Sequence, residues 1–597
     1  MKTKLIWILS ICASIILLLV AVTKSPLELR LLVLVVGAAL ISCIGVIIFL
    51  AVRKPVEIND VSAGHGQHGK ARWGTQQEKR DTYNFVPQGN ELSPGIVYGF
   101  ENDTWITDDS EHNVMLLAPP GAGKTTRIII PTICYNAHVN RNTAGKGASM
   151  LIMDCKGELF RSTAGELQAD GYRTPTLDLR EIMKSDRYNL LIHVNLEIDQ
   201  YKVSHDKMQK AIHYGTAERY AKQLAFQLIP DNPSAAKSDS GDYFNETARG
   251  LLIGIILAVS EYAPAPSRHI ISVFSLILEL NGQDESATVT PFGGSQKTKL
   301  ASLLEKLENE RIRYYTGPAD SADSRTSQNV FSSALGKLVK FIDAELEQLL
   351  CGDTEDAFDA SLFIEQPTAI FCISPDENPS RHFMSSLLTR SLMDGVLALS
   401  ETVYDGKLPR SVYMILDEFG QQPAIPNFDA LSAALRSRGG RILIAVQSFA
   451  QLEKQYNKTM SNIIQDTNQT ILTSFVAPSS LETAKKLSEI LGSETILTGS
   501  TNWQMGKTST THSLIGRPLM SVSDLITMPA GIFLIIKGGK NPLWIKPPGS
   551  WEYLQTKAAA ARTELLYRDI LTVKAADLAA RCGPLSYDLT PGMFDDD

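Results

Sequence analysis

The sequence predicts an α/β protein that carries a helical insertion and an apolar amino-terminal segment. Short apolar runs alternate with helical patterns over most of the 597 residues. From about 190 to 360 helical patterns dominate, and two uncharged apolar runs occupy the first 55 residues. We therefore expect an anchor over 1–55, the first part of an α/β domain over 56–190, an inserted all-α domain over 191–360, and the second part of the α/β domain over 361–597.

The apolar runs Leu5–Val22 and Leu31–Val52 contain no charged residue. A helix needs about 20 apolar residues to cross a bilayer, so the two runs predict a transmembrane hairpin of two helices. The alternative for the first run is a cleaved signal peptide, because Lys2 and Lys4 precede it. In either case the basic residues that begin at Arg53 favour an inner-membrane anchor with the bulk of the chain in the cytoplasm.

Charge is distributed unevenly along the chain. The net charge of −8 divides into +5 over 1–55 and −13 over the remainder, so a nucleic-acid partner would need a local basic lining. The 44% hydrophobic and 20% charged composition excludes disorder of the whole chain. Seven scattered cysteines without CxxC spacing suit a reducing compartment and offer neither a disulfide framework nor a zinc site.

Beyond a polar, glycine-bearing connection over 56–112, apolar runs predict the strands of the α/β domain. We expect strands at 113–117, 149–154, 174–178, 368–372, 412–416, 441–446, 470–476, 531–537 and 542–546. Within the insertion we expect helices at 217–228, 246–262, 272–280 and 300–315. The acidic tail at 594–597 is either a frayed end or a docking tag.

The first of these strands leads into a glycine-containing loop, a Gly-Lys-Thr sequence and a helical pattern, which is the context of a P-loop. Gly121 and Gly123 let backbone N–H groups curl around phosphate, and the following helix start adds partial positive charge. Lys124 is predicted to reach the β- and γ-phosphates of ATP, and the Thr125 hydroxyl to ligate Mg²⁺. The predicted binding residues are Pro120, Gly121, Ala122, Gly123, Lys124, Thr125 and Thr126.

A P-loop needs a second strand that delivers a carboxylate, and two strands qualify. The run 150–154 ends in Asp154, whereas the run 412–416 ends in the pair Asp417 and Glu418. The pair suits hydrolysis better, because Asp417 can hold the Mg²⁺ shell while Glu418 polarises the attacking water. The alternatives are a solvated strand end for the pair and a salt-bridged turn for Asp154.

Two further features accompany the strand at 441–446. Gln447 follows its end, where a polar side chain can sense the γ-phosphate; the alternative is a plain helix cap. Before the strand, Arg436 and Arg438 can supply an arginine finger to the ATP of a neighbouring subunit or line a nucleic-acid channel, and an ordinary solvated turn is an equal alternative. Lys124 and Asp417 are 293 residues apart, which requires an inserted domain.

Together these residues resemble the TraG/VirD-type coupling proteins of type IV secretion and conjugation, relatives of the FtsK–HerA-like translocases. The resembling segments are His68–Gly74 (HGKARWG), Asp154–Glu158 (DCKGE, with Cys155 in place of proline), Asp242–Glu246 (DYFNE), Leu416–Gly420 (LDEFG) and Gln447–Ser448. The resemblance implies a RecA-like motor with an inserted all-α domain, assembled as a homo-hexamer at the inner membrane.

The resemblance also implies an activity. We expect an ATPase that delivers a relaxase–single-stranded DNA complex, effector proteins or both to a secretion channel, with the channel ATPases, inner-membrane proteins and membrane lipid as partners. The alternative is a recruitment platform for protein cargo in which ATP only controls assembly.

Overall fold

The computed structural model describes residue 26 and residues 66–230, 239–282, 297–307, 309–351, 357–375, 377–504 and 507–581. Its centre is a nine-stranded mixed sheet in the order β14-β13-β10-β4-β9-β8-β5-β7-β6. The strands are β4 (Val114–Leu117), β5 (Ser149–Asp154), β6 (Thr176–Asp178), β7 (Ala369–Ile373), β8 (Val412–Leu416), β9 (Gly440–Val446), β10 (Thr470–Thr473), β13 (Phe533–Lys537) and β14 (Leu543–Ile545). Each of the nine expected strands is present.

Seven strands of the sheet, from β10 to β6, are parallel, whereas β13 and β14 join antiparallel at one edge. Parallel strands are buried on both faces, which explains why their sequences are continuous apolar runs. β4 lies between β9 and β10, and β8 lies between β9 and β5. The carboxyl ends of β4 and β8 therefore reach the same edge of the sheet with one strand between them.

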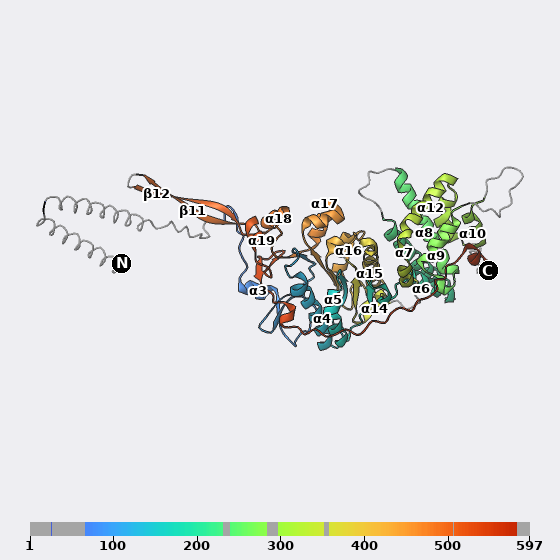
Figure 1. The fold of residues 1–597 in the computed structure, drawn as a ribbon, viewed down its shortest axis with the longest axis horizontal. Helices are drawn as coiled ribbons and strands as arrows, with labels where there is room; N and C mark the ends of the chain where they lie inside the picture. The colour runs from blue at the N-terminus through green and yellow to red at the C-terminus, as the bar shows by residue number, and fades with distance from the viewer. Residues whose placement is uncertain are drawn as a thin grey trace, which may run out of the picture. The chain divides into compact units, whose positions relative to one another are not determined.

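Helices cover both faces of the sheet (Figure 1). α4 (Ile130–Asn142) and α5 (Glu158–Ala169) pack on one face with the side chains of Leu116 and Ile152. The opposite face, which carries Met115 and Met153, packs in the core that includes residues of α15, α16 and α17. The remaining helices of this layer are α14 (Ala360–Glu365), α15 (Phe383–Thr402), α16 (Phe428–Ser437), α17 (Phe449–Thr467), α18 (Leu481–Leu491) and α19 (Val522–Thr527).

Much of the region expected to be a polar connection over 56–112 is folded, which corrects that prediction. After α3 (Gln76–Thr82), the strands β1 (Asn84–Pro87), β2 (Ile96–Glu101) and β3 (Thr104–Asp108) form an antiparallel sheet. Trp105 is completely buried against Tyr135 of α4 and Tyr553, so aromatic packing stabilises this sheet. The polar run Gln76–Thr82 forms α3, and the apolar residues that follow it form the strands.

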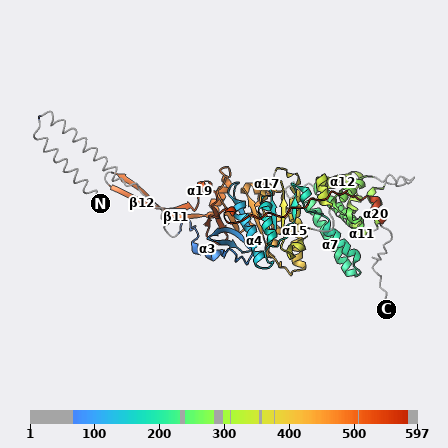
Figure 2. The same ribbon diagram turned by 60° about the horizontal axis from the view of Figure 1, so that its bottom comes forward.

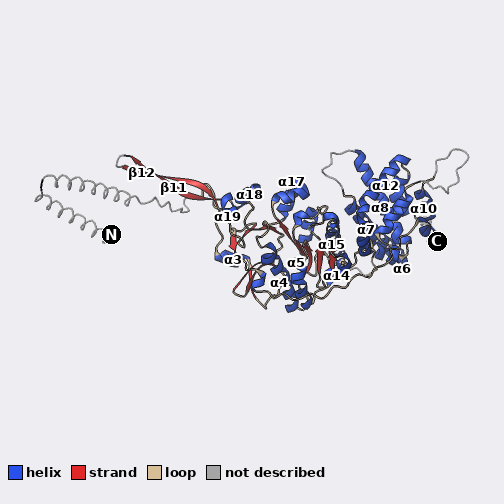
Figure 3. Ribbon diagram, in the orientation of Figure 1, coloured by secondary structure: helices blue, strands red, loops and turns tan. Residues whose placement is uncertain are grey.

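The insertion is helical in its described residues (Figure 3). Its helices are α6 (Ile192–Val203), α7 (Lys207–Leu228), α8 (Asp239–Tyr262), α9 (Ile270–Leu280), α10 (Lys299–Leu307), α11 (Glu310–Asp320), α12 (Ser324–Leu338) and α13 (Ala344–Leu350). The single helix expected at 300–315 is two helices, because the Asn309 side chain accepts the amides of Arg311 and Ile312 and starts α11 there. The apolar face of α8 is central to this block.

The carboxyl-terminal segment returns along the α/β domain to the helical block (Figure 1). Ala560 N–H donates to Gln168 of α5 at 2.8 Å, and Gln348 of α13 exchanges two hydrogen bonds of 2.9 Å with the backbone of Arg568. The segment ends in α20 (Ala575–Arg581), which packs against α8, α9 and α10 (Figure 2). We name residues 554–574 the strap, because they connect the two parts without regular secondary structure.

A separate unit contains the hairpin of β11 (Ser493–Gln504) and β12 (Lys507–Pro518), together with residues up to Lys70. Sequence patterning did not predict this serine- and threonine-rich hairpin. The expected transmembrane hairpin and the acidic tail at 594–597 lie outside the described residues. Among those that are described, no helix is both long and apolar enough to cross a bilayer.

Candidate functional site

The loop that follows β4 has the backbone that a phosphate-binding loop requires. Gly121 and Gly123 have φ angles of +80° and +90°, a region that side chains with a Cβ rarely adopt. Pro120 and Gly121 are exposed, whereas Ala122 is buried. The chain then enters a π-helical turn, η1 (Thr125–Ile129), which includes Thr126 and continues directly into α4.

Lys124 lies at the centre of the site. Its side chain is 5% exposed, and its Nζ donates a 2.8 Å hydrogen bond to the carbonyl oxygen of Ala118 at the start of the loop. The same Nζ is 3.6 Å from Glu418 Oε1. The structure therefore places the lysine of the loop beside the acidic residue Glu418 that follows β8.

Asp417 faces Thr125 across this site, with 3.5 Å between the carboxylate Oδ2 and the hydroxyl Oγ1. Burial and the neighbouring Glu418 carboxylate raise the pKa of Asp417 to about 7, while Lys124 acts in the opposite direction. A hydroxyl and a carboxylate are oxygen donors of the kind that Mg²⁺ prefers. These two side chains therefore fit the expected magnesium site.

Amide side chains hold Glu418 from two directions. Its Oε2 accepts a hydrogen bond of 2.8 Å from Gln447 Nε2 and one of 3.0 Å from Gln421 Nε2. Glu418 itself has a φ of +48°, an uncommon conformation for a residue with a side chain, which directs its carboxylate toward Lys124. Gln447 is fixed in turn, since its N–H donates to Gln451 Oε1 at 2.9 Å.

Sequence reasoning missed Gln421 and Gln451, and also the buried Gln422. The Nε2 atom of Gln422 lies 3.1 Å from Cys155 Sγ and 3.1 Å from Ser374 Oγ, and so connects the ends of β8, β5 and β7. The sequence does contain a signal for them. Gln421 and Gln422 directly follow the segment Leu416–Gly420, and Gln451 lies one helical turn after Gln447.

Asp154, the other candidate acid, accepts hydrogen bonds from backbone N–H groups near the start of α5. Its Oδ2 accepts the Phe160 N–H at 2.8 Å, and its Oδ1 accepts the Lys156 N–H at 3.3 Å. The carboxylate thus caps the first turn of α5. Of the two acidic strands, it is β8 whose carboxylates contact the loop residues Lys124 and Thr125.

The two arginines lie at the opposite end of β9 from Gln447. A rise of about 3.3 Å per residue separates the ends of this strand by roughly 20 Å, so neither arginine reaches the site of its own chain. Arg438 donates to Glu401 Oε1 at 2.7 Å and to the Ala434 carbonyl at 2.9 Å. Arg436 is half-buried near the end of α16.

Two of the segments that resemble the coupling proteins, His68–Gly74 and Asp242–Glu246, make no contact with Asp417 or Glu418 that the described residues show. Arg72 forms a bidentate pair with Glu78, and Trp73 packs against Trp544 of β14 with ring centroids 4.9 Å apart. The stretch Asp242–Glu246 lies in the first turns of α8. The contacts of Arg72 and Trp73 are therefore local structural ones.

The chain is similar in sequence to proteins of type IV secretion and conjugation. A family model described as "Type IV secretory system Conjugative DNA transfer" matches residues 70–562. The protein VirD4 of Agrobacterium fabrum is 21% identical over 497 residues, which cover 81% of this chain and 65% of that protein. The chain thus spans slightly less than two thirds of that relative. The conjugal transfer protein TraG of Escherichia coli is 22% identical over 568 residues, 85% of this chain and 81% of TraG.

Solved structures of the plasmid coupling protein TrwB share the fold. The complex of TrwB with the ATP analogue ADPNP has a TM-score of 0.54 and 12% identity, and covers 84% of this chain and 100% of that one. The complex of TrwB with ADP and Mg²⁺ has a TM-score of 0.51 and 12% identity, with 83% and 98% covered. The α/β fold around the P-loop is therefore similar to that of TrwB.

Proposed function

Because the chain belongs to the type IV secretory system conjugative DNA transfer family, we propose that it is an inner-membrane ATPase that couples substrates to a type IV secretion or conjugation channel. The convergence of Lys124 with the acidic pair Asp417 and Glu418 carries this proposal. A platform that only recruits cargo has no need for a carboxylate held beside the phosphate-binding lysine.

Each side chain of the site has a task in hydrolysis. ATP bound with Mg²⁺ supplies the γ-phosphoryl group, and Thr125 and Asp417 would hold the ion. The loop from Pro120 to Thr126 binds the phosphates through its backbone, and Lys124 adds a buried positive charge. Catalysis of this reaction is mainly positioning and electrostatic stabilisation, which a preformed loop can provide.

Glu418 is the proposed general base. Its Oε2 is already oriented by two amides, and its Oε1 faces Lys124. A phosphate that attracts Lys124 leaves Glu418 free to accept the proton of a water molecule. Gln447, which contacts Glu418 directly, then reports whether the γ-phosphate is present.

Arg436 and Arg438 lie at the end of β9 opposite to Gln447, and this position supports a role for them at the ATP of a neighbouring subunit. Arg436 or Arg438 lies too far from its own site to contact ATP, so either one would serve the site of a neighbouring copy in a homo-hexamer. Arg436 is the better placed, since the guanidinium of Arg438 is engaged by Glu401. A lone subunit should accordingly hydrolyse ATP slowly.

The proposed substrates are a relaxase–single-stranded DNA complex, effector proteins or both. We place the chain in the inner membrane through the two apolar runs before residue 55, next to other secretion-system ATPases and inner-membrane proteins. The matching VirD4 and TraG proteins support this assignment. The net charge of −13 beyond residue 55 requires any DNA path to concentrate basic residues locally.

The proposal is tested with the full-length protein in detergent. ATPase activity is measured with and without single-stranded DNA over a series of salt concentrations, for the parent and for Lys124→Ala. We expect activity that depends on Lys124 and is stimulated by DNA less strongly as salt rises. In a separate transfer assay in cells, substrate transfer that survives in Lys124→Ala would identify a recruitment platform instead.

A further inference from the structure

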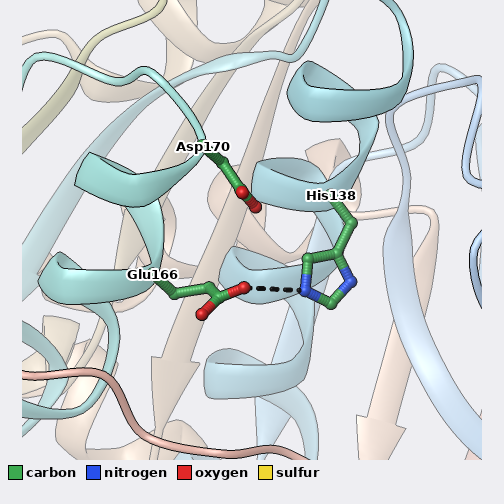
Figure 4. A group of neighbouring side chains, drawn as sticks. All are labelled: His138, Glu166 and Asp170. Carbon is green, nitrogen blue, oxygen red and sulfur yellow. Dashed lines mark hydrogen bonds and ion pairs between the residues drawn. The ribbon is translucent and has the colours of Figure 1, made fainter.

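We propose that His138, Glu166 and Asp170 form a binding site for a zinc-like divalent cation, separate from the nucleotide site. His138 belongs to α4, Glu166 belongs to α5, and Asp170 directly follows α5. Each offers one ligand atom, and these atoms all lie within 4.8 Å of one another (Figure 4). All three residues are buried, at 6%, 8% and 7% exposure.

The distances suit a tetrahedral ion. Metal–ligand distances of about 2.0–2.2 Å at a tetrahedral zinc place neighbouring ligand atoms roughly 3.3–3.6 Å apart. His138 Nε2 and Glu166 Oε1 are already 3.3 Å apart. The ligand atom of Asp170 lies within 4.8 Å of both and would have to move closer to complete three protein ligands, and water would take the fourth position.

Asp170 provides the independent indication of a missing ligand. Its Oδ2 is buried and has no hydrogen-bond partner among the residues described. The carboxylate points toward the space between Glu166 and His138 (Figure 4). A buried carboxylate oxygen without a partner carries a large desolvation cost, and a cation bound at this point would remove that cost.

A further carboxylate lies on the other side of the histidine ring. His138 Nδ1 is 3.7 Å from Glu91 Oε1, beyond hydrogen-bond distance, and Glu91 is completely buried, so a slight turn of the ring on binding a metal would bring the two atoms into contact. The same Oε1 is fixed by Trp105 Nε1 at 2.7 Å, and Oε2 accepts from Asn142 at 2.7 Å. Histidines that bind metals generally direct their second nitrogen to such an acceptor. This arrangement turns Nε2 toward Glu166 and Asp170.

The charge balance also leaves room for a cation. Glu91, Glu166 and Asp170 face two cations, Arg141 and Lys557, which contact Glu166 at 3.7 Å and 2.8 Å and remain about half exposed. Arg141 also reaches Asp170 Oδ1, at 3.4 Å, and leaves Oδ2 open. With a neutral imidazole the group therefore keeps one excess negative charge.

The donor set selects the class of ion. One imidazole nitrogen with two carboxylates suits Zn²⁺, whereas Mg²⁺ and Ca²⁺ prefer oxygen ligands alone. The bound ion would fasten α4, which continues from the phosphate-binding loop, to α5. Lys557 would add the start of the strap to the same point.

The test uses the full-length protein in detergent, stripped with a chelator and dialysed against Zn²⁺ in the presence of excess Mg²⁺ and without nucleotide. Bound zinc is counted by mass spectrometry, and its coordination is examined by X-ray absorption. The variants are His138→Gln and Asp170→Asn, which remove ligands, and Glu91→Gln, which removes the orienting carboxylate. His213→Gln is the matched control, because its ring pairs with Glu197 at 2.8 Å outside any such three-residue group in the described chain.

We expect one zinc ion that the parent and His213→Gln bind and that both ligand variants lose, with nitrogen and oxygen ligands in the absorption spectrum. Glu91→Gln should bind roughly 10- to 100-fold more weakly. Thermal unfolding of each metal-free variant verifies that it folds. The proposal is overturned if the parent binds no more zinc than the folded ligand variants.

Discussion

Lys124 Nζ lies 3.6 Å from Glu418 Oε1, so the proposed phosphate-binding group and the proposed base are in contact. This contact pairs the buried ammonium of Lys124 with a carboxylate that is 16% exposed. Bound phosphate competes for Lys124 and leaves Glu418 with its two amide donors. We therefore expect that nucleotide binding itself exposes the base, and that the acid and the lysine act as one unit.

The first prediction concerns Glu418→Gln. The amide keeps the shape and the hydrogen bonds of the site but cannot accept a proton, so ATP should still bind while turnover falls roughly 100-fold or more. Steady-state ATPase rates and binding of a fluorescent ATP analogue measure the two effects. Glu482→Gln, on the exposed surface of α18, is the control. Hydrolysis at the parental rate would rule out Glu418 as the base.

The two amides that hold Glu418 should differ in importance. Gln447 follows β9 and is fixed by Gln451, so Gln447→Ala should lower kcat by roughly 100-fold with little change in KM. Gln421→Ala removes a bond to the same oxygen from the more exposed side, and its effect should be much smaller. Equal losses in both variants would argue against a special role for Gln447.

Asp154 should contribute to stability and not to catalysis. Asp154→Ala removes two hydrogen bonds to the first turn of α5 and should lower the free energy of unfolding by about 1 kcal/mol. Urea denaturation measures this loss. Nucleotide affinity should stay close to that of the parent, whereas Asp417→Ala should lower it strongly. A loss of nucleotide binding in Asp154→Ala at unchanged stability would reverse the two roles.

A buried ion pair connects the small sheet to the large one. Lys537 of β13 contacts Asp108 at 2.6 Å and Ser110 at 3.0 Å, and Asp108 also accepts from Tyr98. Lys537→Met leaves a buried carboxylate without its cation and should cost about 3–5 kcal/mol. Thermal unfolding should show that the further change Asp108→Asn recovers part of this loss. Additive losses in the double variant would contradict the coupling.

His269 should make stability depend on pH. Burial lowers its pKa to about 4. The ring Nδ1 accepts the Ser272 N–H at 3.3 Å, and Nε2 lies 3.2 Å from the Leu571 carbonyl of the strap. The Nδ1 atom can accept the Ser272 N–H only when the ring is neutral, whereas Nε2–H donates to the Leu571 carbonyl in either protonation state. Because the unfolded chain binds a proton from about pH 6.5 downward, the free energy of unfolding should fall as the pH drops from about 6.5 toward 4.

Thermal unfolding between about pH 7.5 and about pH 5 checks this expectation. His269→Gln should show a shallower decrease with falling pH than the parent. Stability that increases toward pH 5 at this site would give the opposite sign and contradict the buried neutral ring.

Much of the α/β domain could be predicted because its strands are buried on both faces. Runs such as 412–416 and 441–446 contain few polar residues, and each is followed directly by a residue of the proposed site. The acidic pair and Gln447 could be placed for the same reason, since the carboxyl ends of neighbouring parallel strands meet at one edge.

Other parts depend on contacts that a local pattern does not contain. The sheet around Trp105 is stabilised by Tyr135 and Tyr553, which are distant in the sequence. The strap has no periodic pattern, because its hydrogen bonds run to residues such as Gln168 and Gln348 of other elements. The group at His138 likewise joins residues of two helices and a loop, with no shared sequence motif.

The position of β4 between β9 and β10 has a consequence for biosynthesis. Both neighbours of this strand leave the ribosome more than 300 residues after it. At a synthesis rate of about 5–20 residues per second, β4 waits roughly 15 to 65 seconds for the first of them. During that interval the nascent chain exposes an unpaired apolar strand. Chaperones that bind such strands should therefore determine how much of the protein reaches the folded state.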